Sequence, residues 1–280
     1  MRGQGIAKYW LLPLIQLILS LGSAPIMAAE QRPILSLVID DLGYSYQYGR
    51  KAIELEGDHT YAIIPGTGYA RKLAQLAQQH KKEVILHLPL QASNPGAASE
   101  ANALNETMDE NQLTNNLVSM LAEIPVIKGV NNHMGSHLTQ IDYFMRPIMD
   151  VIKAYNPDFY FLDSRTSPKS IAHTEALNSG LSSIRRDIFL DNNHENPESI
   201  HLQFQVWLQK ARDKGHAVAI GHPHPNTIQY LRENLAPVNR QFRFLSVSKL
   251  IDQKHHENGS GDSIEAELSY AQAKGGSESN

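Results

Sequence analysis

The sequence contains no cysteine, so disulfide bonds, thiolate chemistry and zinc sites with cysteine ligands are all excluded. It also lacks three glycine-rich motifs: the P-loop, the dinucleotide-binding fingerprint and the serine-hydrolase elbow. Basic residues are not in surplus, because 25 Lys and Arg stand against 29 Asp and Glu. We therefore expect no nucleic-acid partner, since binding to phosphates requires clustered positive charge.

The first residues follow the three-part pattern of a secretory signal peptide. Basic residues precede an apolar run at 9–19, and small residues follow at 21–29. A membrane anchor is the alternative, but the run is shorter than the ~20 residues that span a bilayer. Pro13 and Gln16 also interrupt it. We therefore expect a signal peptide over 1–28, a periplasmic mature protein and no permanent membrane anchor.

From residue 33 onward, short apolar runs alternate with helical patterns, which is typical of an α/β fold with a parallel sheet. Seven or eight such units in one domain predict a closed or nearly closed barrel. The domain is expected to cover 33–251, with a long rim loop at 91–105 and a disordered polar tail at 252–280. Strands are expected at 34–39, 60–64, 84–88, 126–130, 159–162, within 183–190, and at 217–220 and 242–247. Helices are expected at 47–55, 68–80, 109–123, 143–155, 170–178, 196–214 and 227–234.

Nearly every predicted strand ends at a polar residue that can take part in chemistry. Active sites of β/α barrels lie at these carboxyl ends. Turns and helix caps explain single Asp, Asn or Ser residues there, but not three separate histidine clusters. The residues concerned are Asp40, Asp41, His87, Asn131, Asn132, His133, His137, Asp163, Ser164, Arg165, Asp187, Asp191, His222 and His224.

The adjacent carboxylates of Asp40 and Asp41 would repel each other unless a proton or a cation lies between them. One divalent metal ion, for which zinc is the expected identity, resolves this repulsion when one carboxylate and two imidazoles bind it. Such a site keeps an open coordination position and lowers the pKa of water. The second aspartate is then available as a general base.

These residues carry a resemblance to known families. Asp40-Asp41 resembles the paired-aspartate motif of carbohydrate-esterase-4 polysaccharide deacetylases, and His133 and His137 have the spacing of their metal motif. The chain is more closely similar to the divergent polysaccharide deacetylase family over about 33–250. The similarity is carried by the segments 38–43, 87–89, 129–136, 162–164, 186–191 and 221–223.

The resemblance implies a distorted (β/α)7-type barrel that removes acetyl groups from the N-acetylated sugars of a polysaccharide. It implies Asp41 and His133 as metal ligands, and either His137 or His87 as the third. It also implies Asp40 as the base and His222 as the acid that protonates the leaving amine. Two further groups, Arg165 and Asp187, would support the acid and the base. We also expect a substrate-binding role for Asn132, Ser164, Asp191 and His224.

Two alternatives remain open. Met134 stands where the deacetylase metal motif usually has Ser or Thr, and Arg165 is followed by Thr166 rather than Pro-Tyr. These departures leave room for a non-catalytic, sugar-binding envelope protein on the same fold. A metallophosphoesterase is the second alternative, because Asn132-His133 resembles one of its elements. That family needs a fuller two-metal ligand set than this sequence offers.

Overall fold

The computed structural model describes residues 32–94, 100 and 102–257. The expected signal peptide, part of the rim loop and the tail beyond residue 257 lie outside these described residues. In the part of the chain that the structure describes, each helix is too short or too polar to cross a lipid bilayer.

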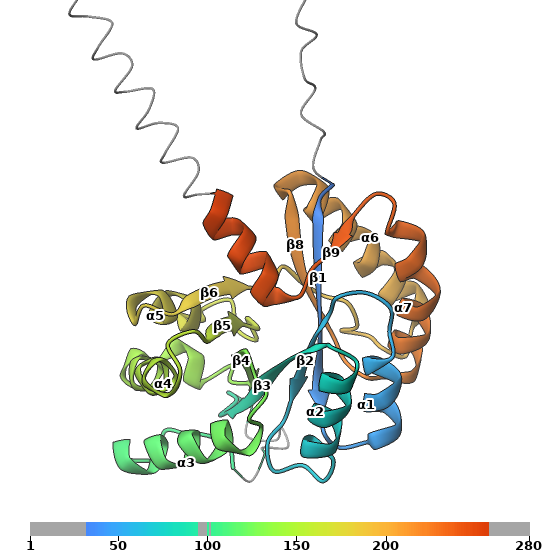
Figure 1. Cartoon of the computed structure of the whole chain (residues 1–280). Helices are drawn as coiled ribbons and strands as arrows, with labels where there is room; N and C mark the ends of the chain where they lie inside the picture. The colour runs from blue at the N-terminus through green and yellow to red at the C-terminus, as the bar shows by residue number, and fades with distance from the viewer. Residues whose placement is uncertain (1–31, 95–99, 101, 258–280) are drawn as a thin grey trace, which may run out of the picture. The chain divides into compact units, whose positions relative to one another are not determined.

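A single parallel sheet organises the described residues (Figure 1). Its strands follow the order β6-β5-β4-β3-β2-β1-β8-β7, with β9 paired to β1. The strands are β1 (Ile34–Leu42), β2 (Thr60–Ile63), β3 (Glu83–Leu90), β4 (Gly129–Met134), β5 (Tyr160–Asp163), β6 (Ser182–Arg185), β7 (Ile188–Phe189), β8 (His216–Gly221) and β9 (Arg243–Phe244).

The two ends of this sheet are joined by one short stretch of chain. Arg186 N–H donates to the carbonyl of Asp163 on β5 at 3.0 Å, and the next residue, Asp187, donates to Val218 on β8 at 2.8 Å. Because two consecutive residues bond to opposite ends of the sheet, the sheet curls into a barrel that is not fully hydrogen-bonded at this seam. The observed fold is therefore the distorted β/α barrel that the sequence predicts.

Helices flank the strands (Figure 1) and cover the outer apolar face of the sheet. They are α1 (Tyr46–Ile53), α2 (Ala70–Gln79), α3 (Glu110–Glu123), η1 (Leu138–Gln140), α4 (Asp142–Tyr155), α5 (Ala172–Asn178), α6 (Pro197–Lys214), α7 (Pro225–Val238) and a last helix over residues 247–257. Local signals explain their ends. Asp109 and Gln112 form a capping box at α3, and Asn196 with Pro197 begins α6.

The inner face of the barrel has a repeat of two residues along each strand, as strand geometry requires. Val38, Ala62, Ile85, Leu162 and Ile220 form an apolar layer inside the barrel. Two residues further along the chain from Val38, Ile85, Leu162 and Ile220, polar residues continue the same face near the carboxyl ends of β1, β3, β5 and β8: Asp40, His87, Ser164 and His222. The strand period therefore brings these polar residues to one end of the barrel.

The carboxyl end of the domain differs from the sequence prediction. The strand expected at 242–247 is only two residues long, and a helix occupies residues 247–257. Val247, Leu250 and Ile251 have helical spacing and pack against the inner apolar layer. This packing extends ordered structure beyond residue 251, where we expected the disordered tail to begin. The expected sixth strand is likewise divided into β6 and β7.

Candidate active site

An irregularity at the end of β1 turns two consecutive carboxylates toward the same space. The pairing of β1 with β2 shifts register between Ile39 and Leu42, and Asp41 has a left-handed backbone with φ of 57°. In a regular strand, Asp40 and Asp41 would point to opposite faces. Here both reach one side chain, since the Nε2 atom of His87 lies 3.6 Å from Asp40 and 3.1 Å from Asp41.

Three side chains from β1, β3 and β4 converge at this point. Nδ1 of His133 lies 2.9 Å from Oδ1 of Asp41 and 3.2 Å from Nε2 of His87. Together with the 3.1 Å separation of His87 from Asp41, these distances form a small triangle. A tetrahedral zinc ion with bonds of about 2.1 Å holds its ligand atoms about 3.4 Å apart. The triangle is therefore close to the size that such an ion requires.

Asn131 determines which nitrogen of His87 can bind a metal. Its amide Nδ2 donates to Asp40 at 2.9 Å, so its carbonyl oxygen faces His87, whose Nδ1 donates to it at 2.7 Å. Neutral His87 then carries its proton on Nδ1 and a lone pair on Nε2. That lone pair faces the carboxylate of Asp41, and two acceptors this close require a positive charge between them. The donor set therefore fits a divalent cation.

The pKa values are consistent with this requirement. Burial alone would lower the pKa of His87, but the carboxylates of Asp40 and Asp41 outweigh burial and raise it. Burial opposes ionisation of Asp41 as well, yet its hydrogen bonds to His133 and His87 lower its pKa. The protein without metal therefore places a proton where a metal ion would otherwise supply the positive charge.

Asp40 lies beneath the triangle in a more enclosed position. Its side chain is buried, and burial raises its pKa above the usual aspartate value, although His87 and His222 partly offset this effect. The amide of Asn131 holds one of its oxygens. A buried carboxylate with a raised pKa is a stronger base than an exposed one, so Asp40 is suited to accept a proton.

His222 faces the triangle from β8. Its Nε2 lies 4.0 Å from Oδ2 of Asp41, and its Nδ1 donates to buried Asp191 at 2.9 Å. Asp191 also accepts from the backbone of His222 at 2.7 Å and from the hydroxyl of Thr227 at 2.9 Å. Burial opposes the charged form of His222, but the carboxylates of Asp191, Asp41 and Asp40 together outweigh burial and raise its pKa to about 9. Protonated His222 is thus a candidate proton donor.

Three residues singled out from the sequence lie away from this arrangement. His137 pairs with Glu106 at 2.8 Å, so of the two alternatives for a third ligand, His87 is the one beside Asp41 and His133. Asp187 pairs with Lys214 at 2.8 Å and accepts from the backbone of Val218. The side chain of Arg165 is exposed. The carboxylate that contacts His222 is Asp191, in the place where we expected Asp187.

Three of the four expected substrate-binding residues are buried: Asn132, Ser164 and Asp191. Asn132 accepts from the backbone N–H of Ser164 at 2.9 Å and donates to the carbonyl of Met134 at 2.8 Å. These bonds connect the ends of β4 and β5, which gives Asn132 and Ser164 positioning contacts within the protein. His224 is partly exposed, and its ring stacks on His194 with a centroid separation of 3.7 Å.

The structure places three residues beside the candidate site to which the sequence analysis gave no role. Asn131 orients both Asp40 and His87, and Thr227 holds Asp191. The guanidinium of Arg186 lies 3.5 Å from the ring centroid of Phe189, and that ring in turn stacks on His222. Burial and neighbouring Arg165 lower the pKa of Arg186 to about 10. Strand periodicity could have identified Asn131, whereas the contacts of Arg186 and Thr227 depend on the fold.

A second group of possible ligand atoms belongs to Asp191, His222 and His224. Here, however, Asp191 already accepts three hydrogen bonds, and its partner His222 has a raised pKa. A cation would have to compete with a protonated imidazole at this position. We therefore assign Asp191 as the residue that orients His222, and the two-metal set of a metallophosphoesterase receives no support from it.

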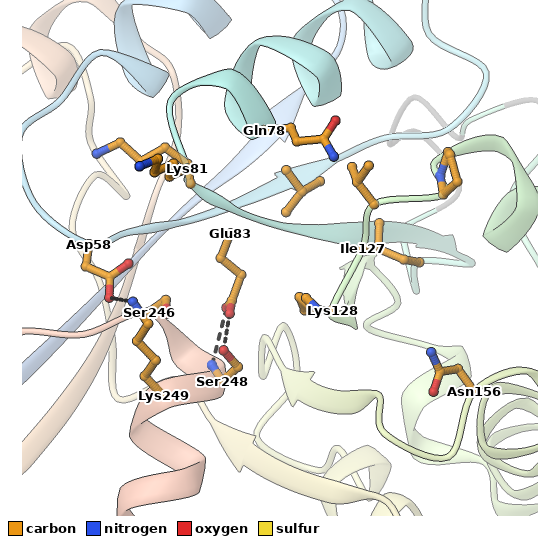
Figure 2. Close-up of a pocket in the computed structure, with 14 residues that line it drawn as sticks. Asp58, Gln78, Lys81, Glu83, Ile127, Lys128, Asn156, Ser246, Ser248 and Lys249 are labelled. Carbon is orange, nitrogen blue, oxygen red and sulfur yellow. Dashed lines mark hydrogen bonds and ion pairs between the residues drawn. The ribbon is translucent and has the colours of Figure 1, made fainter.

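A separate cavity of about 620 Å³ lies at the opposite, amino-terminal ends of the strands (Figure 2). Its two carboxylates are paired within the protein. Glu83 accepts from Thr60, Tyr160 and Ser248, and Lys249 pairs with Asp58 at 2.7 Å. None of the residues that line it is a histidine. Carboxylates that are already satisfied in this way do not point to catalysis.

Comparison with other proteins identifies relatives in two bacteria. The chain is 31% identical to YibQ, an uncharacterized protein of Escherichia coli, over 231 residues that cover 82% of this chain and 70% of the other. It is 32% identical to an uncharacterized Haemophilus influenzae protein over 216 residues, 77% of this chain and 76% of the other.

Among solved structures, an uncharacterized Agrobacterium tumefaciens protein, ATU2773, shares the fold with a TM-score of 0.74 and 21% identity. The match covers 80% of this chain and 91% of the other. The sequence profile of the family described as "Divergent polysaccharide deacetylase" matches residues 37–251, which include every strand-end residue discussed above. The chain therefore belongs to the divergent polysaccharide deacetylase family.

Proposed function

We propose that the protein is an exported, metal-dependent hydrolase that removes acetyl groups from the N-acetylated sugars of a polysaccharide. One observation carries the proposal: the carboxylate of Asp41 and ring nitrogens of His87 and His133 form a triangle with sides of 2.9–3.2 Å. Asp40 and His222 lie beside this triangle. Membership of the family supports a carbohydrate substrate.

Asp41, His87 and His133 would hold the metal, and we propose zinc because one carboxylate and two imidazoles suit its tetrahedral coordination. A metal ion there would polarise a carbonyl oxygen and lower the pKa of water. The hydrogen bond from His87 to Asn131 keeps the ligand nitrogen, Nε2, unprotonated. Hydrogen bonds of this kind fix the ring orientation and typically change metal affinity about 10–100-fold.

Asp40 would act as the general base. Its carboxylate would accept the proton of the attacking water, and its raised pKa increases its basicity relative to an ordinary aspartate. Asn131 keeps one oxygen of Asp40 occupied by donating to Oδ1. The other oxygen, Oδ2, is the one that faces His87 at 3.6 Å and the mouth of the barrel.

His222 would act as the general acid. Asp191 holds Nδ1, so the proton on Nε2 is the one presented toward Asp41 and the acetamide. Transfer of that proton to the amide nitrogen allows the carbon–nitrogen bond to break, with the amine as leaving group. Removing a positioned acid or base costs typically ~10²–10⁴-fold in rate.

Acetate release from N-acetylglucosamine polymers by the zinc-loaded protein is the direct test. We expect release that stops when a chelator removes the metal and returns when zinc is added. A protein with one bound metal per chain that released no acetate from any such polymer would contradict the proposal. The non-catalytic, sugar-binding alternative would then take its place.

Export is the remaining part of the proposal and rests on the signal-peptide pattern over residues 1–28. Cell fractionation combined with sequencing of the amino terminus tests it. We expect a periplasmic protein that begins near residue 29. Recovery of a membrane-bound form that retains Met1 would contradict cleavage.

A further inference from the structure

Two tyrosine rings lie exposed at the same end of the barrel as Asp41. Tyr44 follows Asp41 by three residues and is 53% exposed, and Tyr69, which precedes α2, is 43% exposed. The N–H of Tyr69 donates to the carbonyl of Gly43 at 3.0 Å, so the loops after β1 and β2 lie side by side. Figure 1 shows the two helices that follow these loops, α1 and α2, next to each other.

The two loops that carry these rings are closely packed against each other. Gly43 has φ of +135°, and a Cβ there would lie only 1.9 Å from Oγ1 of Thr67, so the two loops approach as closely as glycine permits. The ring of Tyr69 contacts Tyr46 at a centroid distance of 6.0 Å, and the ammonium of Lys72 lies 4.1 Å from the centre of Tyr46. Tyr69 is therefore packed against Tyr46, while its own ring remains accessible.

Tyr44 is held at its hydroxyl end. The hydroxyl group donates to Glu100, and a carboxylate oxygen of Glu100 lies 3.9 Å from Nε2 of His133. The contact orients the ring at the edge of the proposed active site and leaves much of the ring in solvent. Tyrosine offers a large, rigid contact area and loses little conformational entropy when a ligand binds.

We propose that Tyr44 and Tyr69 form a stacking subsite for sugar rings of the polysaccharide next to the sugar whose acetamide reaches Asp40 and His222. A pyranose ring presents C–H groups on its faces, and the electron-rich face of an aromatic ring attracts them. This inference rests on the proposed function. It implies that the protein acts within a chain of sugars rather than on a free monosaccharide or a dimer.

Binding measured by calorimetry tests the subsite, with Asp40→Asn as the background so that the ligand is not consumed. The probes are β-1,4-linked N-acetylglucosamine hexamer and dimer. We expect the hexamer to bind more tightly, and Tyr44→Ala and Tyr69→Ala each to reduce this advantage about fivefold. Tyr44→Phe should retain most of it, because the ring provides the stacking surface and the hydroxyl group only orients the ring.

Tyr155→Ala is the matched control. Tyr155 is 42% exposed, close to the exposure of Tyr69, but it ends α4 at the opposite end of the barrel. Equal affinity for dimer and hexamer in the parent, or an unchanged hexamer advantage in the double variant of Tyr44 and Tyr69, would overturn the subsite.

Acetate release separates this inference from the proposed function. Tyrosine-dependent hexamer binding without any acetate release by the parent would leave the subsite standing and overturn the hydrolase. Acetate release that is equally efficient on dimer and hexamer, with a KM unaffected by the two alanine variants, would overturn the subsite and leave the hydrolase standing.

Discussion

The interior of the barrel carries polar side chains at both ends, and the two ends differ in how those groups are satisfied. At the amino-terminal end, Glu83 accepts hydrogen bonds from three residues, each of which supplies a hydroxyl group (Figure 2 shows the contacts with Ser248). At the carboxyl end, the lone pair of His87 faces the carboxylate of Asp41 at 3.1 Å, because Asn131 occupies the other ring nitrogen.

The contrast separates a structural polar group from a functional one. Both ends contain half-buried carboxylates, so the presence of a buried acid does not by itself identify a site. A carboxylate surrounded by hydrogen-bond donors has its hydrogen bonds satisfied within the protein and contributes to stability. A carboxylate that faces other hydrogen-bond acceptors lacks a donor and requires a proton or a cation between them. Predictions for the two ends therefore concern different measurements.

The largest effect is expected for a metal ligand. His133→Ala should lose both the metal and the activity, because it removes one of three atoms of the triangle, whereas losing an orienting partner typically costs only about 10–100-fold. Elemental analysis and acetate release measure the two effects. His137→Ala is the control and should keep its metal, since His137 pairs with Glu106. Loss of metal in the control alone would reverse the ligand assignment.

The proposed general base, Asp40, provides the second test at the carboxyl end of the barrel. Asp40→Asn should reduce kcat about 10²–10⁴-fold with metal content unchanged, because the proton acceptor is lost but every atom of the triangle remains. Asparagine can still accept from Asn131, so the fold should be retained. Full activity in this variant would show that another group takes the proton.

At the amino-terminal end, Glu83→Gln should lower stability and leave metal content unchanged. Glutamine keeps an acceptor for Thr60 and Tyr160 but loses the negative charge, and hydrogen bonds to charged groups contribute about 1.5–3 kcal/mol against about 0.5–1.5 kcal/mol for neutral ones. Thermal unfolding measures the loss, and elemental analysis provides the comparison with His133→Ala. Reduced metal content in Glu83→Gln would mean that the two ends of the barrel are coupled.

The smallest effect is expected in the pH profile. His222 must be protonated to act as the acid, so activity should fall as the pH rises through its pKa, which is about 9 in the protein without metal. Asp191 makes the largest of the contributions that raise this pKa, so Asp191→Asn should move the alkaline limb of kcat/KM to lower pH. An unchanged alkaline limb in Asp191→Asn would indicate that the limb belongs to a different group.

Periodicity was sufficient to predict the barrel, and strand-end composition predicted that the candidate residues gather at its carboxyl end. Alternating apolar runs predicted the order of strands and helices, and the resemblance of Asp40-Asp41 and the His133 segment predicted the family that the profile match confirms. The last helix was missed because the tertiary contacts of Val247 and Leu250 decide the structure there. The split of the sixth strand was missed because the consecutive residues Arg186 and Asp187 bond to different strands.

Side-chain partners were less accessible from the sequence. Whether His87 or His137 accompanies His133 depends on where the chain turns after His133, since Met134 and Gly135, the next two residues, both have positive φ. The choice of Asp191 over Asp187 as the partner of His222 depends on the seam between β6 and β8, where Asp187 is engaged by Lys214. Spacing along the chain does not report such contacts.

Three residues with left-handed backbones stand at the carboxyl ends of β1, β4 and β5: Asp41 with φ of 57°, Met134 with φ of 52° and Arg165 with φ of 48°. For residues other than glycine this conformation costs roughly 1–2 kcal/mol each. Stability and function therefore select for different residues here. In a library selected for heat resistance alone, glycine should accumulate at these positions and raise the melting temperature, and Asp41→Gly would remove a proposed metal ligand in the same step.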